Sequence, residues 1–118
     1  METLPIINQT YELYKLIVDI TTHLEKRWRY SLGMSIEKSV LDCLEDLVMA
    51  KNASKPLKAS YLMKASAELE ITTLKLRLCL ELKLENETRI FQAQSHIREI
   101  GRMTGGWLKS LQNESMKK

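Results

Sequence analysis

The chain has 118 residues, with 18 Lys or Arg, 15 Asp or Glu and a formal net charge of +3, which is the size of a single domain. Glycine and proline together occupy only six positions, whereas leucine occupies 19. Few chain breakers and many helix formers argue against an all-β fold and against a glycine-rich phosphate loop. The modest net charge excludes a polybasic tail and a disordered acidic chain. We therefore expect one all-α domain over residues 1–118.

The charge is unevenly divided along the chain. Residues 1–54 have six Lys or Arg against eight Asp or Glu, whereas residues 55–118 have twelve against seven. The first half is therefore acidic, with a net charge of −2, and the second half is basic, with a net charge of +5. A polyanionic partner is expected at the basic half.

The first residues lack the basic and apolar regions of a secretory signal, and no stretch approaches the ~18 uncharged apolar residues of a membrane span. These features predict a cytoplasmic protein with no membrane partner. Cys43 and Cys79 lie 36 residues apart inside helical patterns. In a reducing compartment we expect them to be small buried hydrophobic residues rather than a disulfide.

The first predicted helix spans residues 6–28, where apolar residues recur every three or four positions. Its expected buried stripe comprises Ile7, Tyr11, Tyr14, Val18, Thr21, Leu24 and Trp28. The run Arg27 to Ser31 breaks this rhythm, and Ser31 is a suitable N-cap for a second helix over residues 31–52. The inner face of that helix is expected to contain Ile36, Val40, Cys43, Leu44, Leu47 and Val48.

The segment Asn52 to Pro56 is the clearest turn of the sequence, because Pro56 is tolerated in the first turn of a following helix. That third helix is predicted over residues 57–84, and Asn86 is expected to cap a fourth over residues 87–112. The fourth helix has a seam of Ile90, Ala93, Ile97, Ile100, Thr104, Trp107 and Leu111. Four such helices joined by short turns predict an antiparallel up-down-up-down four-helix bundle.

Residues 74–84 of the third helix are apolar at every second position, which taken alone is a strand pattern. The lack of β-branched residues and of a partner strand favours a helix. On a helix, the leucines at 74, 78 and 82 lie opposite those at 76, 80 and 84. Only one side can face the core of a small bundle, so the other is expected to contact a second copy of the chain, unless the helix lies unusually deep in its own bundle. The residues assigned to this interface are Leu74, Leu76, Leu78, Leu80 and Leu82.

No catalytic or metal site is predicted. The two histidines, His23 and His96, lie on different predicted helices, and neither has a second ligand at metal spacing. A catalytic serine or cysteine needs a base and an orienting group, and the sequence indicates no such arrangement. We therefore expect a non-enzymatic protein that requires no cofactor.

A basic surface is the remaining candidate site. On the fourth helix, Arg98, Arg102 and Lys109 share one side opposite the apolar seam. Gly105 lies on the same side, where it lets another backbone approach closely. The predicted nucleic-acid-binding residues are these three cations together with Arg77 and Lys83, which border the leucine rows. A few basic residues on a helix face are usually only solvated, and this reading stays open. Smaller basic groups are Lys51, Lys55, Lys58 and Lys64 near the second turn, and Arg27 and Arg29 beside Trp28.

The fourth helix contains the run Glu99-Ile100-Gly101-Arg102-Met103-Thr104-Gly105-Gly106-Trp107. Its three glycines cost about 3 kcal/mol of helix propensity, so bundle packing alone does not demand them. With Leu76-Arg77-Leu78 and Tyr30-Ser31-Leu32-Gly33, this run resembles the accessory variability determinant proteins of diversity-generating retroelements. Those proteins belong to a wider bacterial four-helix-bundle group that includes S23-like proteins.

The resemblance implies a homopentamer with a positively charged channel, which associates with a reverse transcriptase and binds template RNA or DNA. It matches Arg77 and Arg102 with the family's arginines, and Glu99, Gly101, Gly105 and Trp107 with the surrounding motif. A pair between Glu99 and Arg102 within the helix would leave Arg102 less available to phosphate. The alternative is an S23-like structural protein, associated with ribosomal RNA or of unknown role, without a polymerase partner.

Overall fold

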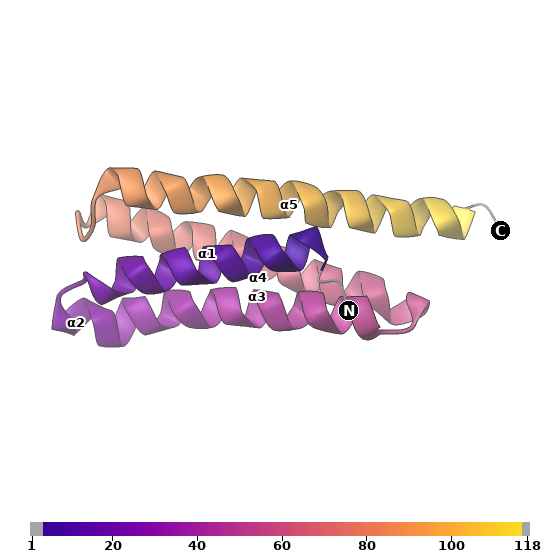
Figure 1. Ribbon diagram of the computed structural model, residues 1–118, viewed down its shortest axis with the longest axis horizontal. Helices are drawn as coiled ribbons and strands as arrows, with labels where there is room; N and C mark the ends of the chain where they lie inside the picture. Colours follow the sequence, from indigo (N-terminus) through magenta and orange to yellow (C-terminus); the bar gives the residue numbers. More distant parts are fainter. Residues whose placement is uncertain (1–3, 117–118) are drawn as a thin grey trace.

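The computed structural model describes residues 4–116, and all of the regular secondary structure in that range is helical. The elements are α1 (Pro5–Thr22), α2 (Lys26–Trp28), the π-helix η1 (Arg29–Gly33), α3 (Met34–Asn52), α4 (Lys55–Glu81) and α5 (Glu87–Met116). The four long helices run along one axis in alternating directions (Figure 1). The all-α prediction is confirmed, and the arrangement is that of an up-down-up-down bundle. None of the described helices is both long enough and apolar enough to cross a membrane.

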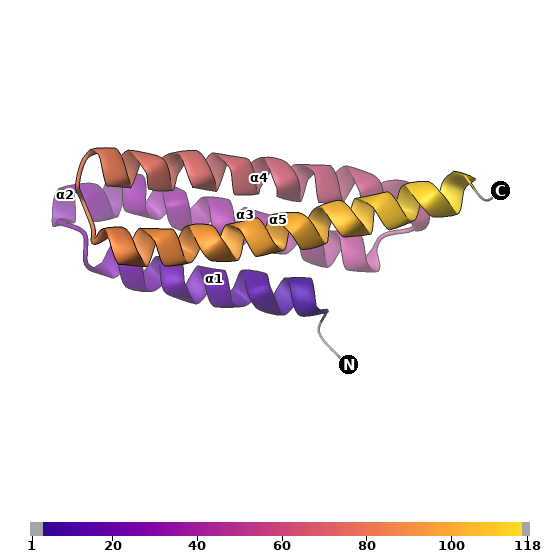
Figure 2. The same ribbon diagram turned by 90° about the horizontal axis from the view of Figure 1, so that it is seen from above.

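Each long helix packs against two neighbours. α1 contacts α3 and α5, and α4 contacts the same two helices from the other side of the bundle. α5 has 30 residues whereas α1 has 18, a difference of about 18 Å at 1.5 Å per residue. The C-terminal turns of α5 therefore extend past the start of α1 (Figure 2).

The core consists of apolar side chains from all four long helices. The largest fully buried residues include Leu13, Ile17, Ile20, Ile36, Leu47, Leu62, Leu76, Ile90 and Ile100. Burial of one such side chain contributes about 1.5–3 kcal/mol to folding. Three buried threonines, Thr10, Thr72 and Thr104, each donate a hydroxyl hydrogen bond to the carbonyl four residues earlier, so these polar atoms are satisfied inside the core.

Both cysteines are free and buried, as predicted. Burial raises the pKa of the Cys43 thiol to about 12 and that of the Cys79 thiol to about 11. Both groups are therefore neutral near pH 7, and they pack as small apolar residues.

The seam predicted for the fourth helix is confirmed, because Ile90, Ala93, Ile97, Ile100 and Thr104 are all buried. Trp107 and Leu111 continue this row as partly buried residues packed against the core. A strict three-four alternation thus locates the buried side of α5 correctly.

The stripe predicted for the first helix is correct only in part, because Ile7, Thr21 and Leu24 are buried but Tyr11 and Val18 are not. The buried row runs through Leu13, Ile17 and Ile20, whereas Tyr11 is 54% exposed and Val18 is 36% exposed. Two apolar rows run along this helix, and the aliphatic row is buried because a buried tyrosine would also need a partner for its hydroxyl.

The first helix ends at Thr22 rather than at residue 28, and helical structure resumes at Lys26 rather than at Ser31. The guanidinium of Arg29 donates to the carbonyl of Thr22 at 3.0 Å, which satisfies a group that the end of α1 leaves free. Ser31 does not act as an N-cap, since its hydroxyl donates to the carbonyl of Arg27. The apolar rhythm continues across this turn, so periodicity alone conceals it.

Side chains cap two other helix ends. Lys58 donates to the carbonyls of Ala50 at 2.8 Å and Lys51 at 3.0 Å, at the C-terminal end of α3. Lys58 is therefore a helix cap rather than part of a free basic patch. Asn86 is confirmed as the cap of α5, because its side-chain oxygen accepts a hydrogen bond from the Thr88 N–H at 2.7 Å.

α4 ends at Glu81, before the predicted end at residue 84, in a turn around Lys83. Lys83 has a φ of 56°, the only positive φ of a non-glycine residue in the described chain. Its N–H donates to the Leu80 carbonyl at 3.1 Å, and the Leu84 N–H donates to the Cys79 carbonyl at 3.0 Å. These two bonds form a Schellman motif, whose left-handed position is usually occupied by glycine.

Replacing Lys83 with glycine should raise the free energy of unfolding by about 1 kcal/mol, because a Cβ in the left-handed region costs about that much. Urea unfolding followed by circular dichroism would measure the change. Lys83→Ala is the matched control, since it removes the charge and keeps the Cβ. Equal stability of the two variants would contradict the assigned strain.

Candidate nucleic-acid interface

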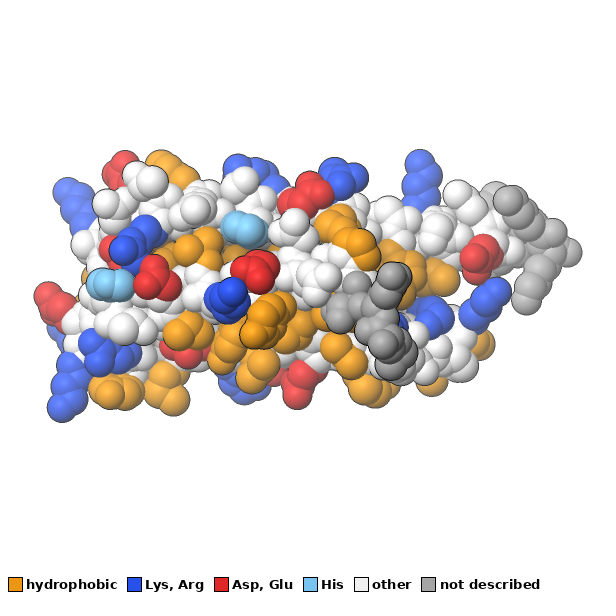
Figure 3. Space-filling model, viewed as in Figure 1, with side chains coloured by type: hydrophobic (Ala, Val, Ile, Leu, Met, Phe, Trp, Pro, Cys, Tyr) orange, Lys and Arg blue, Asp and Glu red, His pale blue; other side chains and the backbone are white. Residues whose placement is uncertain are grey.

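The predicted basic stripe lies on the outer side of α5. Arg98, Arg102 and Lys109 are exposed, whereas Ile97 and Ile100 of the same helix are buried. Because this buried seam packs against α1 and α4, the opposite side of α5 is directed to solvent. Lys and Arg side chains project along the α5 edge of the molecule (Figure 3).

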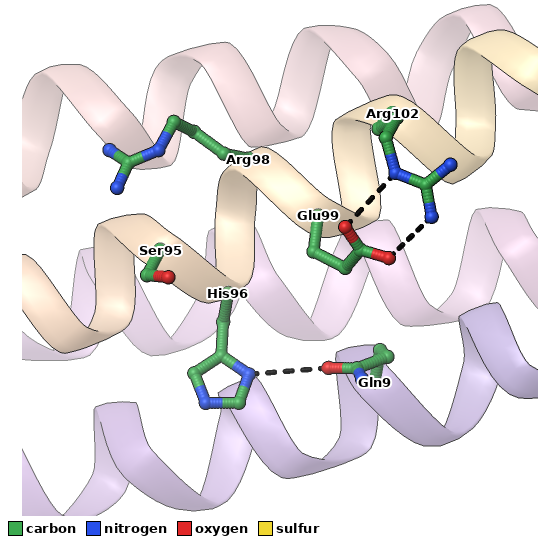
Figure 4. Close-up of a pocket in the computed structure, with 6 residues that line it drawn as sticks. All are labelled: Gln9, Ser95, His96, Arg98, Glu99 and Arg102. Atoms are coloured by element: carbon green, nitrogen blue, oxygen red, sulfur yellow. Dashed lines mark hydrogen bonds and ion pairs between the residues drawn. The ribbon is translucent and has the colours of Figure 1, made fainter.

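Arg102 is paired within its own helix. Its Nη2 and Nε donate to the two carboxylate oxygens of Glu99 at 2.6 and 3.0 Å (Figure 4). These hydrogen bonds lower the pKa of Glu99 and raise the pKa of Arg102. The expected pair is therefore present, and it uses donors that Arg102 would otherwise offer to phosphate.

Arg98 and Lys109 are different, because neither has an ion-pair partner among the described residues. Both side chains are exposed. An unpaired surface cation keeps its full charge for an incoming anion and has no salt bridge to break first. These two residues are therefore exposed cations of α5 that no ion pair engages among the described residues.

Two glycines of α5, Gly101 and Gly105, leave a bare strip of backbone beside these cations, and Gly106 lies about 100° further round the helix than Gly105. A Cβ added at Gly101, Gly105 or Gly106 would meet nothing within 4 Å. Packing within one copy therefore does not require glycine here, although each costs about 1 kcal/mol of helix stability. A strip without side chains lets a bulky partner come close to the helix backbone.

A shallow, open hollow between α1 and α5 adjoins the stripe (Figure 4). It is lined by Gln9, Ser95, His96, Arg98, Glu99 and Arg102. His96 Nδ1 lies 3.3 Å from Gln9 Oε1, and Figure 4 shows Arg98 directed away from the Glu99–Arg102 pair. The sequence gives no signal for Gln9 or His96 at this site, because helical periodicity does not say which helices are neighbours.

The cations of α4 are not joined to the α5 stripe. The Nε atom of Arg77 lies 3.6 Å from Glu81 Oε1 on the same helix. Lys83 lies in the loop after α4. Lys75 donates to the Ser39 hydroxyl of α3 at 2.6 Å, so it belongs to the contact between α3 and α4. The five predicted nucleic-acid-binding residues thus comprise the α5 stripe and two separate positions at α4.

The two leucine rows of α4 are separated as predicted. Leu76 is fully buried and Leu80 packs partly buried against the core, whereas Leu74, Leu78 and Leu82 are 56%, 42% and 43% exposed. Leu76 and Leu80 therefore pack in or against the core of one copy, and Leu74, Leu78 and Leu82 are the predicted interface residues that one copy leaves exposed. The exposed row also shows that α4 is not sunk all round in its own bundle.

A second exposed apolar surface lies on another side of the molecule. Its members on α1 and α3 are Tyr11, Val18, Met34, Leu41 and Val48. Figure 3 shows hydrophobic side chains gathered over these two helices. One copy therefore exposes two distinct apolar faces, the outer row of α4 and the face of α1 and α3.

Within the described residues, no group of three or more His, Cys, Asp or Glu side chains is placed to hold a metal ion. The Nδ1 atom of His23 lies 2.7 Å from the Asp19 carbonyl oxygen and 3.3 Å from Arg89 Nη1. This is a surface contact between the end of α1 and α5. The two histidines thus lie at separate positions along the contact between α1 and α5.

No curated protein matches the sequence. The family model described as bAvd-like matches residues 4–111, from the residue before α1 into the last turns of α5. The matched range includes the glycine-rich run of α5 and Arg77 of α4. Because the match extends over most of the sequence, the chain belongs to the bAvd-like family.

Proposed function

We propose that the chain is a non-catalytic accessory protein of a diversity-generating retroelement. It acts in the cytoplasm as an oligomeric scaffold that contacts the reverse transcriptase and presents its basic α5 stripe to template RNA or DNA. Membership of the bAvd-like family supports this role. The observation that carries it is the placement of two unpaired cations, Arg98 and Lys109, beside the bare backbone at Gly105.

The two unpaired cations of one copy, Arg98 and Lys109, would bind nucleic acid only weakly. A symmetric assembly would repeat this pair in every copy. Each phosphate that a Lys or Arg neutralises releases counterions, so the binding constant falls more steeply with salt as more phosphates are neutralised. A ring of copies would place one α5 stripe in each repeat. The local positive charge could then be large even though each chain carries a net charge of only +3.

The two exposed apolar faces support assembly of several copies. α1 and α3 together have three Lys or Arg and six Asp or Glu, a net charge of −3. α4 and α5 have nine and six, a net charge of +3. A contact between the α4 row of one copy and the α1 and α3 face of the next would bury both apolar surfaces and pair opposite charges.

Because these two faces differ, the contact is heterologous, and repetition closes a ring when the rotation between copies permits it. The resemblance described above favours five copies. The proposed interface residues on α4 are Leu74, Leu78 and Leu82, which are exposed in one copy.

Reversing the two free cations, in an Arg98→Glu/Lys109→Glu variant, should weaken retention of RNA and reduce the salt slope by about 0.7–0.9 for each phosphate that is no longer neutralised. Filter binding over a series of salt concentrations measures both quantities. Lys15→Glu/Lys38→Glu is the matched control, with the same change of charge on α1 and α3. Equal RNA retention by the α5 variant and the wild type would reject the stripe as the site.

Gly105→Ala should stabilise the fold by about 1 kcal/mol, because the added Cβ meets no neighbour and alanine favours helix. If a nucleic-acid backbone approaches this strip, the same methyl group should lower the affinity for RNA. Gly106→Ala is the control, since it gives the same gain in stability and lies about 100° further round the helix. Unfolding midpoints and RNA titrations of both variants would separate the effects, and unchanged affinity of Gly105→Ala would contradict the close approach.

Leu78→Glu should yield a smaller species that keeps its helical circular dichroism, because it puts a charge in the proposed interface and leaves the core intact. Light scattering after size-exclusion chromatography measures the mass. Gln92→Glu adds the same charge at an exposed position of α5 and should keep the mass of the wild type. An unchanged mass for Leu78→Glu would refute assembly through α4.

A further inference from the structure

One end of the bundle contains two unusual backbone segments. The turn after α1 and the loop between α4 and α5 both lie at this end (Figure 1). The turn includes the π-helix Arg29–Gly33, and the loop holds Lys83 at a φ of 56°. A π-helical turn and a left-handed non-glycine residue are both uncommon, and both occur often at functional sites.

The turn is firmly held by contacts that leave its outer surface free. Arg29 donates to the carbonyl of Thr22, the last residue of α1, and to that of Leu24 just after it. Gly33 allows a close approach, because a Cβ there would lie 3.2 Å from the Trp28 carbonyl oxygen. None of these contacts uses the side chain of Tyr30, which is 61% exposed. The backbone of this turn therefore keeps the Tyr30 ring exposed to solvent.

Two exposed cations lie in the same turn as this ring. Lys26 and Arg27 precede Tyr30 by four and three residues, in the helical segment that runs from α2 into η1. The Arg27 guanidinium lies over the Trp28 ring, 4.8 Å from its centroid. Neither Lys26 nor Arg27 has an ion-pair partner among the described residues.

Acidic residues balance much of this charge. Glu25 adjoins the turn, and Glu85 and Glu87 follow Lys83. A net positive potential therefore cannot be the main attraction at this end. What the end offers is an exposed aromatic face with a few cations beside it, a combination that suits stacking of unpaired bases.

We propose that this end of the bundle binds unpaired nucleotides, with a base stacked on Tyr30 and neighbouring phosphates contacted by Lys26 and Arg27. The inference rests on the proposed function and adds the form of the ligand. Bases within a duplex already stack on one another, so the site discriminates against duplex RNA. Lys83 supplies a further cation at the same end.

A binding measurement with the full chain tests this assignment. The sequence has two tryptophans, so a Trp107→Phe background leaves Trp28 as a fluorescent reporter beside the site. The probes are an unstructured ten-nucleotide oligouridylate and a ten-base-pair RNA duplex. We expect the single strand to quench Trp28 fluorescence and to bind more tightly at this end than the duplex.

In that background, Tyr30→Ala should weaken single-strand binding by about 5- to 100-fold, whereas Tyr30→Phe, which keeps the ring, should bind like its parent. The salt slope should stay nearly constant in both variants, because every cation that faces phosphate is kept. Unchanged single-strand affinity of Tyr30→Ala would overturn the proposal, as would an equal decrease in Tyr30→Phe or an equal decrease in duplex binding. A Tyr30→Ala variant that binds RNA like its parent but no longer associates with the reverse transcriptase would also overturn the proposal. That result would assign this surface to a protein partner.

The outcome is separable from that of the proposed function. The Arg98→Glu/Lys109→Glu variant tests the charged stripe through the salt slope, whereas Tyr30→Ala tests stacking at constant slope. If the stripe variant no longer retains RNA and Tyr30→Ala binds single-stranded RNA with the affinity of its parent, only the stacking site is rejected. If the stripe variant and Tyr30→Ala both bind RNA like the wild type, both assignments are rejected.

Discussion

A helix with leucine at every second position cannot direct all of them to one core, and α4 is built under this constraint. Leu76 enters the core, and Leu74, Leu78 and Leu82 remain in contact with water. Apolar area removed from water contributes about 25 cal/mol per Å², so a single copy leaves this free energy unrealised. The second apolar face, on α1 and α3, lies on another side and carries the opposite charge. In the proposed assembly, these two faces are the two halves of a contact that one copy cannot make with itself.

One periodic segment and one helix cap are predicted well, whereas the cap predicted at Ser31 is wrong. The seam of α5, the cap at Asn86 and the division of the α4 leucines all follow from spacing and local hydrogen bonding. The turn after α1 is predicted several residues too late, because the apolar rhythm continues past Thr22 and the anchor, Arg29, acts through backbone carbonyls. The buried row of α1 is misplaced because two rows compete, and packing against α3 and α5 decides between them.

The candidate site divides in the same way. Periodicity places Arg98 and Lys109 on one free side of α5, and the short spacing of Glu99 and Arg102 predicts their pair. It does not show that Gln9 of α1 lies beside His96, since that contact depends on which helices are neighbours. Nor does it show that Lys58 and Lys75 are used in contacts with α3. Basic residues on one helix therefore differ in their contacts. Some bind groups within the bundle, and others face solvent.

The buried cysteines give the molecule two internal reporters. Cys43 lies on α3 and Cys79 on the adjacent α4, and their raised pKa values leave almost no thiolate at neutral pH. Neither side chain has exposed surface, so a thiol-specific reagent reaches them only when the helices separate, and its rate records how often the bundle opens locally. Covering the outer side of α4 with another copy would slow that reaction without contacting either sulfur. The rate of thiol modification would then report both local opening of the core and assembly of several copies.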